Sequence, residues 1–468
     1  MDYKRLAELL FPDVTMTPEE LEEKYPPRNL PEGAKVTRFA PSPTGFVHIG
    51  GVYQTMVGER LAHQSGGVFY LRIEDTDAKR EVPGAAEGLI NTLARYGIRF
   101  DEGAAIGENG EIIDRGDYGP YKQSLRGDIY HVYAKKLVSE GKAYPCFTTE
   151  EELRALEAVD KKAEVKSREW TEETEAEQKA AMRRLREFTI EDVERNLAAG
   201  NRFVLRILAD GDPEKKTPFT DLVKGKLEIP ENDEDFVLLK SDGIPTYHFA
   251  HAVDDHLMRT THVIRGEEWL PSVAKHIQLF RYLGFRLPKY LHTAQIMRLD
   301  ENGNKKKFSK RDLGANMNDY ERDGYAPAAV SEYLLTVLNS NFEEWRMQNP
   351  DKPFTDFKFD IKKMCASGCL FDRAKIEDVS KNVVSRMSAD DVYTQLAGWA
   401  KVYDPDFFAL LDRDPAYAKS ILAIGRGGKK PRKDYGLWSE VKAFVSFFYD
   451  ELFTRCLLYT SPSPRDTR

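Results

Sequence analysis

The segment from Ala34 to Gly51, AKVTRFAPSPTGFVHIGG, decides the fold. Its first seven residues predict a strand, and the Pro, Ser, Thr and Gly residues that follow predict a loop. Apolar positions at helical spacing predict a helix from Val52 to Gln64, and VFYLRI at 68–73 predicts a second strand, which ends on the acidic cluster EDTD. Strand, helix and strand within about forty residues have the length of a βαβ unit, whose ligands bind at the carboxyl ends of the strands. We therefore predict an α/β fold with a parallel sheet.

The composition of the whole chain excludes several classes of protein. With 468 residues, the chain is long enough for about three domains. Its 41% hydrophobic and 31% charged residues are typical of a folded globular protein, and its net charge of −8 argues against a polycationic nucleic-acid or membrane binder. Four scattered cysteines indicate a reducing compartment. Because we find no signal peptide and no apolar run near the ~18 residues of a membrane span, we expect a cytoplasmic protein with no membrane partner.

Charge and apolar patterns organise the chain on either side of this unit. Thr17, followed by two glutamates, predicts a capped helix that ends at Tyr25. Residues 128–200 are rich in Glu, Lys, Ala and Arg, which predicts long solvated helices. Apolar runs at 203–208 and 236–240, and Val263-Ile264 ahead of the acidic turn at 266–269, predict that the sheet resumes. We therefore expect a mostly parallel sheet, interrupted by a helical insertion, over residues 34–300.

Helical patterns dominate from the basic stretch at 305–311 to about residue 455. The last residues, CLLYTSPSPRDTR at 456–468, lose this periodicity and end in a Ser-Pro repeat. We hypothesise that this tail is non-native adapter sequence and that the native chain continues differently. Reading the source gene beyond the codon for Arg455 tests the hypothesis, and an in-frame stop codon there contradicts it.

The loop PSPTGFVHIGG at 41–51 has the composition of a phosphate site. Its glycines allow a ligand to approach the backbone closely, and a helix N-terminus offers unpaired N–H groups and a partial positive charge. His48, just before the glycine pair, could stabilise charge on a phosphate oxygen. The alternative is a Pro/Gly-rich turn with a packed histidine, which we would favour for an isolated His-x-Gly.

A second motif, KFSKR at 307–311, follows the turn-forming sequence Asn302-Gly303-Asn304. A basic loop can clamp the phosphates of a nucleotide, since positioning and charge neutralisation supply most of the catalysis in phosphoryl and nucleotidyl transfer. A short basic run is more often a solvated loop. The motif is therefore informative only together with the loop at 41–51.

Together these motifs resemble the two signatures of class I aminoacyl-tRNA synthetases, which read HIGG and KFSKR in this chain. Gly51 stands where the general motif has a second histidine, and Arg311 stands where it ends in serine. Six strings in order are similar to the bacterial-type glutamyl-tRNA synthetases: RFAPSPTGFVHIGG, LRIEDTD, GPYKQSLR, LLKSDGIPTYHFAHAVDDHLM, VIRGEEWL and KFSKRDLG.

The resemblance covers about residues 34 to 455 and implies an α/β fold. We expect a catalytic domain with a Rossmann-type parallel sheet, a helical insertion that binds the acceptor end of tRNA, and a mostly α-helical C-terminal region. The expected parts are an N-terminal extension (1–33), the two halves of the catalytic domain (34–130 and 236–300), the insertion (131–235), a stem-contact region with the KFSKR loop (301–385), a helical, incomplete anticodon-binding region (386–455) and the non-native tail (456–468).

The resemblance also implies a two-step reaction, in which ATP and L-glutamate form glutamyl-adenylate and the 3′-terminal adenosine of tRNA(Glu) then accepts the glutamyl group. ATP is a substrate, accompanied by Mg²⁺. The implied catalytic residues are His48, Ser309 and Lys310. The implied ATP-binding residues are His48, Gly50, Gly51, Lys307 and Lys310. The implied glutamate-binding residues are Arg38, Ala40, Ser42, Glu74, Tyr247, His251 and Arg265, with Glu74 facing the ammonium group and the two arginines facing carboxylates.

Several of these residues also have structural interpretations. Arg38 could be an exposed strand residue, Glu74 a turn acid, and Arg265 an ion-pair partner of Glu267 or Glu268. Tyr247 could be a core residue with a solvated hydroxyl. We favour function for the two arginines and Glu74, and weigh the two interpretations of Tyr247 about equally.

The run YHFAHAVDDH at 247–256 has a spacing that could hold a metal ion, since one helical face could carry His248, His251 and Asp255. The resemblance places this run beside glutamate and the adenylate, so we predict no metal there. Cys146 has no nearby cysteine, so we do not expect the zinc site that some relatives carry in the insertion. Cys365 and Cys369 are predicted to be buried thiols.

For tRNA, the basic run RGGKKPRK at 426–433 is the best phosphate patch in the helical region, with a solvated loop as its alternative. We expect a monomer that charges tRNA(Glu), with tRNA(Gln) as an open second substrate. Two other functions are weighed: a paralogue that attaches glutamate to a modified base of a tRNA, the glutamyl-queuosine enzyme, and a non-catalytic tRNA-binding scaffold. The helical region beyond residue 320 argues against the first, and the retained motif residues argue against the second.

Overall fold

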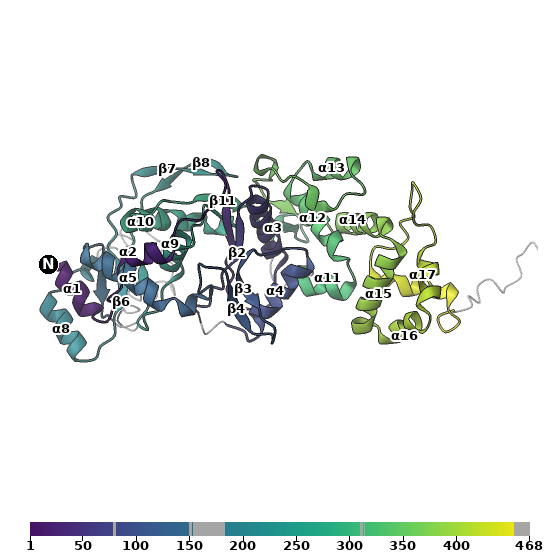
Figure 1. Cartoon of the computed structure of the whole chain (residues 1–468). Coiled ribbons are helices and arrows are strands. Elements are labelled where there is room, and N and C mark those ends of the chain that lie inside the picture. Colours follow the sequence, from purple (N-terminus) through teal and green to yellow (C-terminus); the bar gives the residue numbers. More distant parts are fainter. Residues whose placement is uncertain (78–80, 149–151, 153–182, 309–311, 313, 454–468) are drawn as a thin grey trace, which may run out of the picture. The chain divides into compact units, whose positions relative to one another are not determined.

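The computed structural model describes residues 1–77, 81–148, 152, 183–308, 312 and 314–453 (Figure 1). The chain forms two compact units. The first contains residues Met1–Gly45, Gln54–Ile90 and Arg99–Thr293, and the second contains Phe46–Tyr53, Asn91–Ile98 and the chain from Ala294 onward. Residues 456–468, for which we predict a non-native tail, lie outside the described part.

A parallel sheet forms the centre of the first unit. Strand β1 pairs in parallel with β2, from Val36 opposite Val68 to Phe39 opposite Leu71, and helix α3 connects the two strands along the chain. Strand β2 pairs in parallel with β3, and β4 adds an antiparallel edge. The βαβ unit predicted from the sequence is therefore confirmed. The elements are β1 (Val36–Phe39), α3 (Ile49–His63), β2 (Val68–Leu71), α4 (Ala85–Arg95), β3 (Glu102–Ile106) and β4 (Ile112–Arg115).

The parallel arrangement continues on the other side of β1, where β10 lies next to it. The backbone N–H of Thr261 donates a hydrogen bond to the carbonyl of Val36 at 2.9 Å. Strand β10 pairs in parallel with β11, and β11 meets a hairpin formed by β7 and β8. These elements are β7 (Lys216–Asp221), β8 (Gly225–Pro230), α9 (Tyr247–Leu257), β10 (His262–Gly266), α10 (Val273–Leu283) and β11 (Lys289–Thr293).

The predicted insertion contains strands as well as helices. Strand β6 pairs antiparallel with β5 and with β9, so these three strands form a separate sheet. The prediction that the runs at 203–208 and 236–240 return to the parallel sheet is therefore wrong, because an apolar run does not specify which strand it will pair with. The described elements are α5 (Gly127–Ser139), β5 (Ala143–Cys146), α8 (Ile190–Ala198), β6 (Val204–Ile207) and β9 (Val237–Leu239).

The N-terminal extension packs on the first unit through two short helices, α1 (Tyr3–Leu10) and α2 (Pro18–Lys24). Thr17 caps α2, since its hydroxyl accepts from the N–H of Glu20 and the Glu20 carboxylate accepts from the N–H of Thr17. This confirms the helix and cap predicted there. Arg28 anchors the extension, because its guanidinium donates to both oxygens of Glu102 at 2.7 and 2.9 Å.

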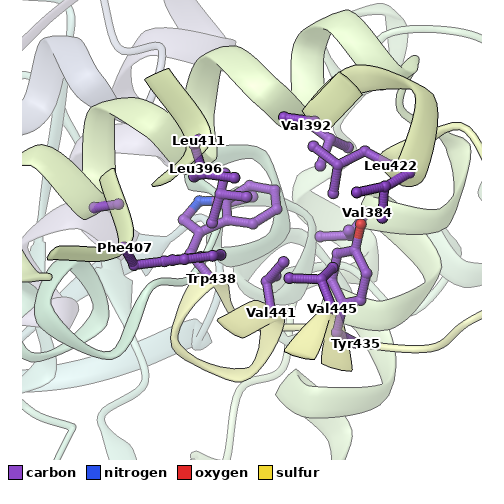
Figure 2. Close-up of a cluster of buried hydrophobic side chains, with 14 of the residues drawn as sticks. Val384, Val392, Leu396, Phe407, Leu411, Leu422, Tyr435, Trp438, Val441 and Val445 are labelled. Carbon is purple, nitrogen blue, oxygen red and sulfur yellow. The ribbon is translucent and has the colours of Figure 1, made fainter. Parts of the chain in front are cut away.

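The second unit is mainly helical and has a small sheet in which β12 pairs with β13 and β14. Its helical end encloses an apolar core in which Leu396, Phe407 and Trp438 come from three different helices (Figure 2). These elements are β12 (Ile296–Leu299), β13 (Lys305–Lys307), α11 (Met317–Asp323), α12 (Pro327–Leu338), α13 (Phe342–Gln348), β14 (Cys369–Leu370), α14 (Arg373–Arg386), α15 (Ala389–Tyr403), α16 (Pro405–Arg413), α17 (Pro415–Leu422) and α18 (Trp438–Phe444).

The fold class predicted from the sequence is confirmed: a parallel-sheet α/β part is followed by a mostly helical region. Within the described ranges, no helix is both long enough and apolar enough to cross a membrane.

The helical core of the second unit gives a first prediction. Leu396→Ala should lower the free energy of unfolding by about 2–5 kcal/mol, because Leu396 is 0% exposed and its removal leaves a cavity. Urea denaturation followed by tryptophan fluorescence measures the change. Val402→Ala on the same helix is the control, since Val402 is 66% exposed. Equal losses in the two variants would contradict the packing in Figure 2.

Candidate active site

Asp255, on α9, is a buried carboxylate that joins three elements of the first unit. It accepts from Nε of Arg38 at 3.1 Å and from Nη1 of Arg72 at 2.8 Å, and it lies 2.8 Å from Nδ1 of His251. Burial alone would raise the pKa of Asp255, but the Arg38 and Arg72 guanidiniums hold it well below its ordinary value. The ionised carboxylate therefore fixes side chains from β1, from the end of β2 and from α9 in one network.

Glu74 lies just beyond the carboxyl end of β2, where its carboxylate accepts from Nη2 of Arg72 at 3.0 Å. Its backbone N–H donates to the carbonyl of Pro41 at 3.0 Å, which ties the acidic turn to the loop after β1. Burial raises the pKa of Glu74, although Arg72 and Arg38 act in the opposite direction. An ammonium group beside Glu74 would favour its ionised form, so this carboxyl is suited to bind one.

Arg265, on β10, is a buried guanidinium whose hydrogen-bond partners are all neutral, and it is 4% exposed. Its Nε donates to Nε2 of His292 at 2.9 Å, and its Nη1 lies 3.1 Å from Nδ1 of His276. Nη1 also donates to the Tyr247 hydroxyl, and Nη2 donates to the Trp269 carbonyl, each at 3.3 Å. No carboxylate in the described part of the chain forms an ion pair with this guanidinium. A bound carboxylate would supply the missing negative charge.

His251 is fully buried and uses both ring nitrogens within the protein. Because Nδ1 faces the Asp255 carboxylate, it carries the proton, and Nε2 accepts from the Tyr290 hydroxyl at 2.9 Å. Burial lowers the pKa of His251 to about 4. A direct contact with glutamate would have to replace one of these bonds, so the glutamate-binding role of His251 stays a prediction.

The five residues Arg38, Glu74, Tyr247, His251 and Arg265 lie in one connected set of contacts. Ala40 follows β1 and is partly buried, whereas Ser42 is exposed in the loop. Sequence reasoning considered Asp255 only as a metal ligand, and it missed Arg72, His276 and His292. An arginine within the otherwise apolar string VFYLRI was a usable signal for Arg72. His276 lies on α10 and His292 lies on β11, and no motif in the sequence marks either of them.

His48 lies in the second unit and precedes α3. Its Nδ1 accepts from the N–H of Gly50 at 3.0 Å, so the proton of a neutral ring is on Nε2. The N–H of Ile49 donates to the Ala315 carbonyl, and the N–H of Gly51 donates to the His48 carbonyl. The prediction that these helix-start amides are unpaired is therefore wrong. A Cβ at position 50 would lie 3.0 Å from Nδ1 of His48, which explains why glycine fits there.

The described residues of the second signature motif and the segment that follows it lie beside His48 in the second unit. His48 forms an antiparallel bridge with Asn316, and the N–H of Met317 donates to the Val47 carbonyl at 3.1 Å. The buried ring of Phe308, within KFSKR, contacts the His48 ring with centroids 6.1 Å apart. Lys307 is exposed at the end of β13. Ser309 and Lys310 lie outside the described residues, so their catalytic roles stay predictions.

The run at 247–256 uses its polar groups in protein contacts. Nδ1 of His248 lies 3.0 Å from Nε2 of His276, while Asp254 accepts from Nε of Arg126 at 2.7 Å and Asp255 holds Arg38. Among the described residues, no group of three His, Cys, Asp or Glu side chains could hold a metal ion.

The basic run at 426–433 divides into two parts. Arg426 faces inward, since its Nε donates to the Leu422 carbonyl and its Nη2 to the Tyr435 hydroxyl, each at 2.7 Å. Lys429, Lys430 and Lys433 are exposed. The three exposed lysines are therefore available to phosphates, while the exposed Arg432 pairs with Asp434 at 2.9 Å.

Comparison with known proteins agrees with this geometry. The family model described as "tRNA synthetases class I (E and Q), catalytic domain" matches residues 35–377. This chain therefore belongs to the class I tRNA synthetases of the glutamate and glutamine family. The residues matched include both signature motifs and every predicted glutamate-binding residue.

Individual relatives extend the match toward the C-terminal region. A protein of Clostridium perfringens (strain SM101) named glutamate--tRNA ligase is 47% identical over 455 residues, which cover 97% of this chain and 80% of that protein. Another glutamate--tRNA ligase, of Acetivibrio thermocellus, is 49% identical and is covered to 81%. The crystal structure of a glutamate tRNA ligase from Elizabethkingia meningosepticum, in complex with its amino acid, matches with a TM-score of 0.72 and 28% identity, over 92% of this chain and 84% of that one.

The buried histidines give a pH prediction for stability. Burial lowers the pKa of His248, His251 and His262 to about 4 from an ordinary 6.5. Between these values the unfolded chain binds protons that the folded chain does not, so the free energy of unfolding should fall as the pH is lowered through this window. His262→Asn should reduce that dependence by up to about 1.4 kcal/mol per pH unit. Urea denaturation between about pH 5 and pH 7 tests this, and an unchanged slope would contradict it.

Proposed function

We propose that this chain ligates L-glutamate to tRNA(Glu) in two ATP-dependent steps. Family membership and the names of the relatives support this function. The observation that carries it is the charge pattern of the candidate glutamate-binding residues: Glu74 can face an ammonium group, while the buried Arg265 has only neutral hydrogen-bond partners. This pattern matches an amino acid with one ammonium and two carboxylate groups.

In the first step, the α-carboxylate of glutamate attacks the α-phosphate of ATP, and pyrophosphate leaves. The reaction needs no side-chain nucleophile, so the protein contributes positioning and charge stabilisation. His48, with its proton on Nε2, can donate to a phosphate oxygen. Gly50 and Gly51 would lie beneath ATP, and Lys307 and Lys310 would contact its phosphates. In the second step, a ribose hydroxyl of the 3′-terminal adenosine takes the glutamyl group and AMP leaves.

Mg²⁺ would neutralise phosphate charge when bound with ATP. The described carboxylates of the pocket do not fit a protein-held ion, because Asp254, Asp255 and Glu74 already pair with arginines. We therefore propose that Mg²⁺ arrives as a complex with ATP and is held largely by the nucleotide.

Three parts of the chain are proposed to bind tRNA. The insertion at 131–235 would hold the acceptor end, the region at 301–385 would follow the stem, and the helical region at 386–455 would meet the anticodon, with its exposed lysines near 430 as phosphate contacts. We propose a cytoplasmic monomer, with tRNA(Gln) as a second substrate to be tested.

Glutamate-dependent exchange of pyrophosphate into ATP, measured with and without tRNA, tests the proposed function. Exchange that requires glutamate is the expected result. No exchange under either condition would favour the non-catalytic scaffold. Charging of purified tRNA(Glu) and tRNA(Gln) then identifies the acceptor, and transfer of glutamate to a modified base, in place of the terminal adenosine, would identify the tRNA-modifying paralogue.

The KFSKR motif gives a kinetic prediction. Lys310→Ala should lower the rate of pyrophosphate exchange by about 100-fold or more, because it removes a cation predicted to stabilise the transition-state phosphates, while the KM for glutamate should stay nearly unchanged. Lys305→Ala is the control, since Lys305 is an exposed lysine of β13 outside the motif. Wild-type turnover in Lys310→Ala would refute the catalytic role.

A further inference from the structure

Arg265 differs from Arg38, Arg72 and Arg126, three other buried arginines of the first unit, because no described carboxylate pairs with its charge. Arg38 and Arg72 pair with Asp255, and Arg126 pairs with Asp254. Arg265 is equally buried, but imidazole nitrogens accept its Nε and Nη1 hydrogens at 2.9 and 3.1 Å. Neutral acceptors orient a guanidinium without cancelling its charge.

The sheet register places His292 beside Arg265. These two residues are direct partners in the pairing of β10 with β11, and β11 in turn pairs with β7, which ends at Asp221. Asp221 lies 2.6 Å from Nδ1 of His292 and also accepts from the His292 backbone N–H at 3.1 Å. All three side chains are buried, with exposures of 4% for Arg265, 0% for His292 and 1% for Asp221.

The hydrogen-bond partners fix the tautomer of His292. Arginine Nε can only donate, so Nε2 of His292 must carry a lone pair where it meets Arg265. The proton is then on Nδ1, where the Asp221 carboxylate accepts it. Burial lowers the pKa of His292 in spite of this carboxylate, which keeps the ring neutral. Arg265 therefore donates to His292, and His292 donates to Asp221, so both hydrogen bonds point the same way along the three side chains.

We propose that Asp221 and His292 are positioning residues for recognition of a glutamate carboxylate. The Asp221 carboxylate keeps the proton of His292 on Nδ1, so that Nε2 of His292 accepts from Nε of Arg265. This second hydrogen bond orients the Arg265 guanidinium, which has no described carboxylate partner, toward the substrate. The inference rests on the proposed function, because it assigns a carboxylate of glutamate to Arg265.

Two substitutions of His292 separate positioning from a merely structural role. In His292→Gln the longer side chain can place an amide oxygen where Nε2 accepts from Arg265. In His292→Asn the amide nitrogen can replace Nδ1 as the donor to Asp221, but the acceptor for Arg265 is lost. If His292 positions Arg265, the KM for glutamate should rise about tenfold or more in His292→Asn and less than about threefold in His292→Gln. The KM for ATP should not change in either variant.

The matched control is His262→Asn, since His262 lies on β10 near Arg265 but contacts Thr261. It should leave the KM for glutamate unchanged. A structural role would reverse the order of the two His292 variants, because His292→Gln leaves the buried Asp221 without its imidazole donor. Such a reversal, or two variants with the wild-type KM, would overturn the proposal.

A measurement on the wild-type enzyme tests the proposal without a substitution that could impair folding. Imidazole ¹⁵N NMR should show the His292 proton on Nδ1, with and without saturating glutamate, and a proton on Nε2 would overturn the proposal. The proposed function fails in a different way, by the absence of glutamate-dependent pyrophosphate exchange in the wild-type enzyme.

Discussion

The hydrogen bonds of the buried Asp255 carboxylate hold the other side chains of the candidate site in place. The carboxylate takes hydrogen bonds from Arg38 on β1 and from Arg72 after β2, and it orients His251 on its own helix. Removal of one member of a buried ion pair leaves an uncompensated charge, which typically costs several kcal/mol. The carboxylate therefore couples the pairing of β1 with β2 to the position of α9. Glu74 depends on it indirectly, because the Arg72 side chain that contacts Asp255 also holds Glu74.

The buried arginines around α9 differ in whether the protein supplies a partner of opposite charge. Arg38, Arg72 and Arg126 pair with the carboxylates of Asp254, Asp255 and Glu74. Arg265 has imidazole, hydroxyl and carbonyl partners, and its charge stays available to a ligand. The arrangement explains how an acidic chain, with a net charge of −8, can build a site for an anionic amino acid. In the proposed function, selectivity for glutamate depends on the oriented guanidinium of Arg265 more than on the overall charge.

The sequence predicted the βαβ unit and the helical second unit, because apolar periodicity and family strings specify local elements and short motifs. The candidate glutamate-binding residues on β1, after β2, on α9 and on β10 lie in one set of contacts, and their binding roles stay predictions. The sequence did not predict the antiparallel sheet formed by β5, β6 and β9, since strand pairing is decided by tertiary contacts. It also missed His276 on α10, and Asp221 and His292, whose contact depends on the register of β11 with its neighbours. The unpaired amides predicted at Gly50 and Gly51 are engaged by His48, which only the three-dimensional arrangement reveals.

A crystal structure of the enzyme with a non-hydrolysable glutamyl-adenylate analogue tests the central claim most directly. The account predicts the ammonium group of the analogue beside Glu74 and its free side-chain carboxylate within hydrogen-bond distance of Arg265, while Nε of Arg265 still donates to His292. A side-chain carboxylate bound away from Arg265, or an Arg265 turned away from His292, would contradict it.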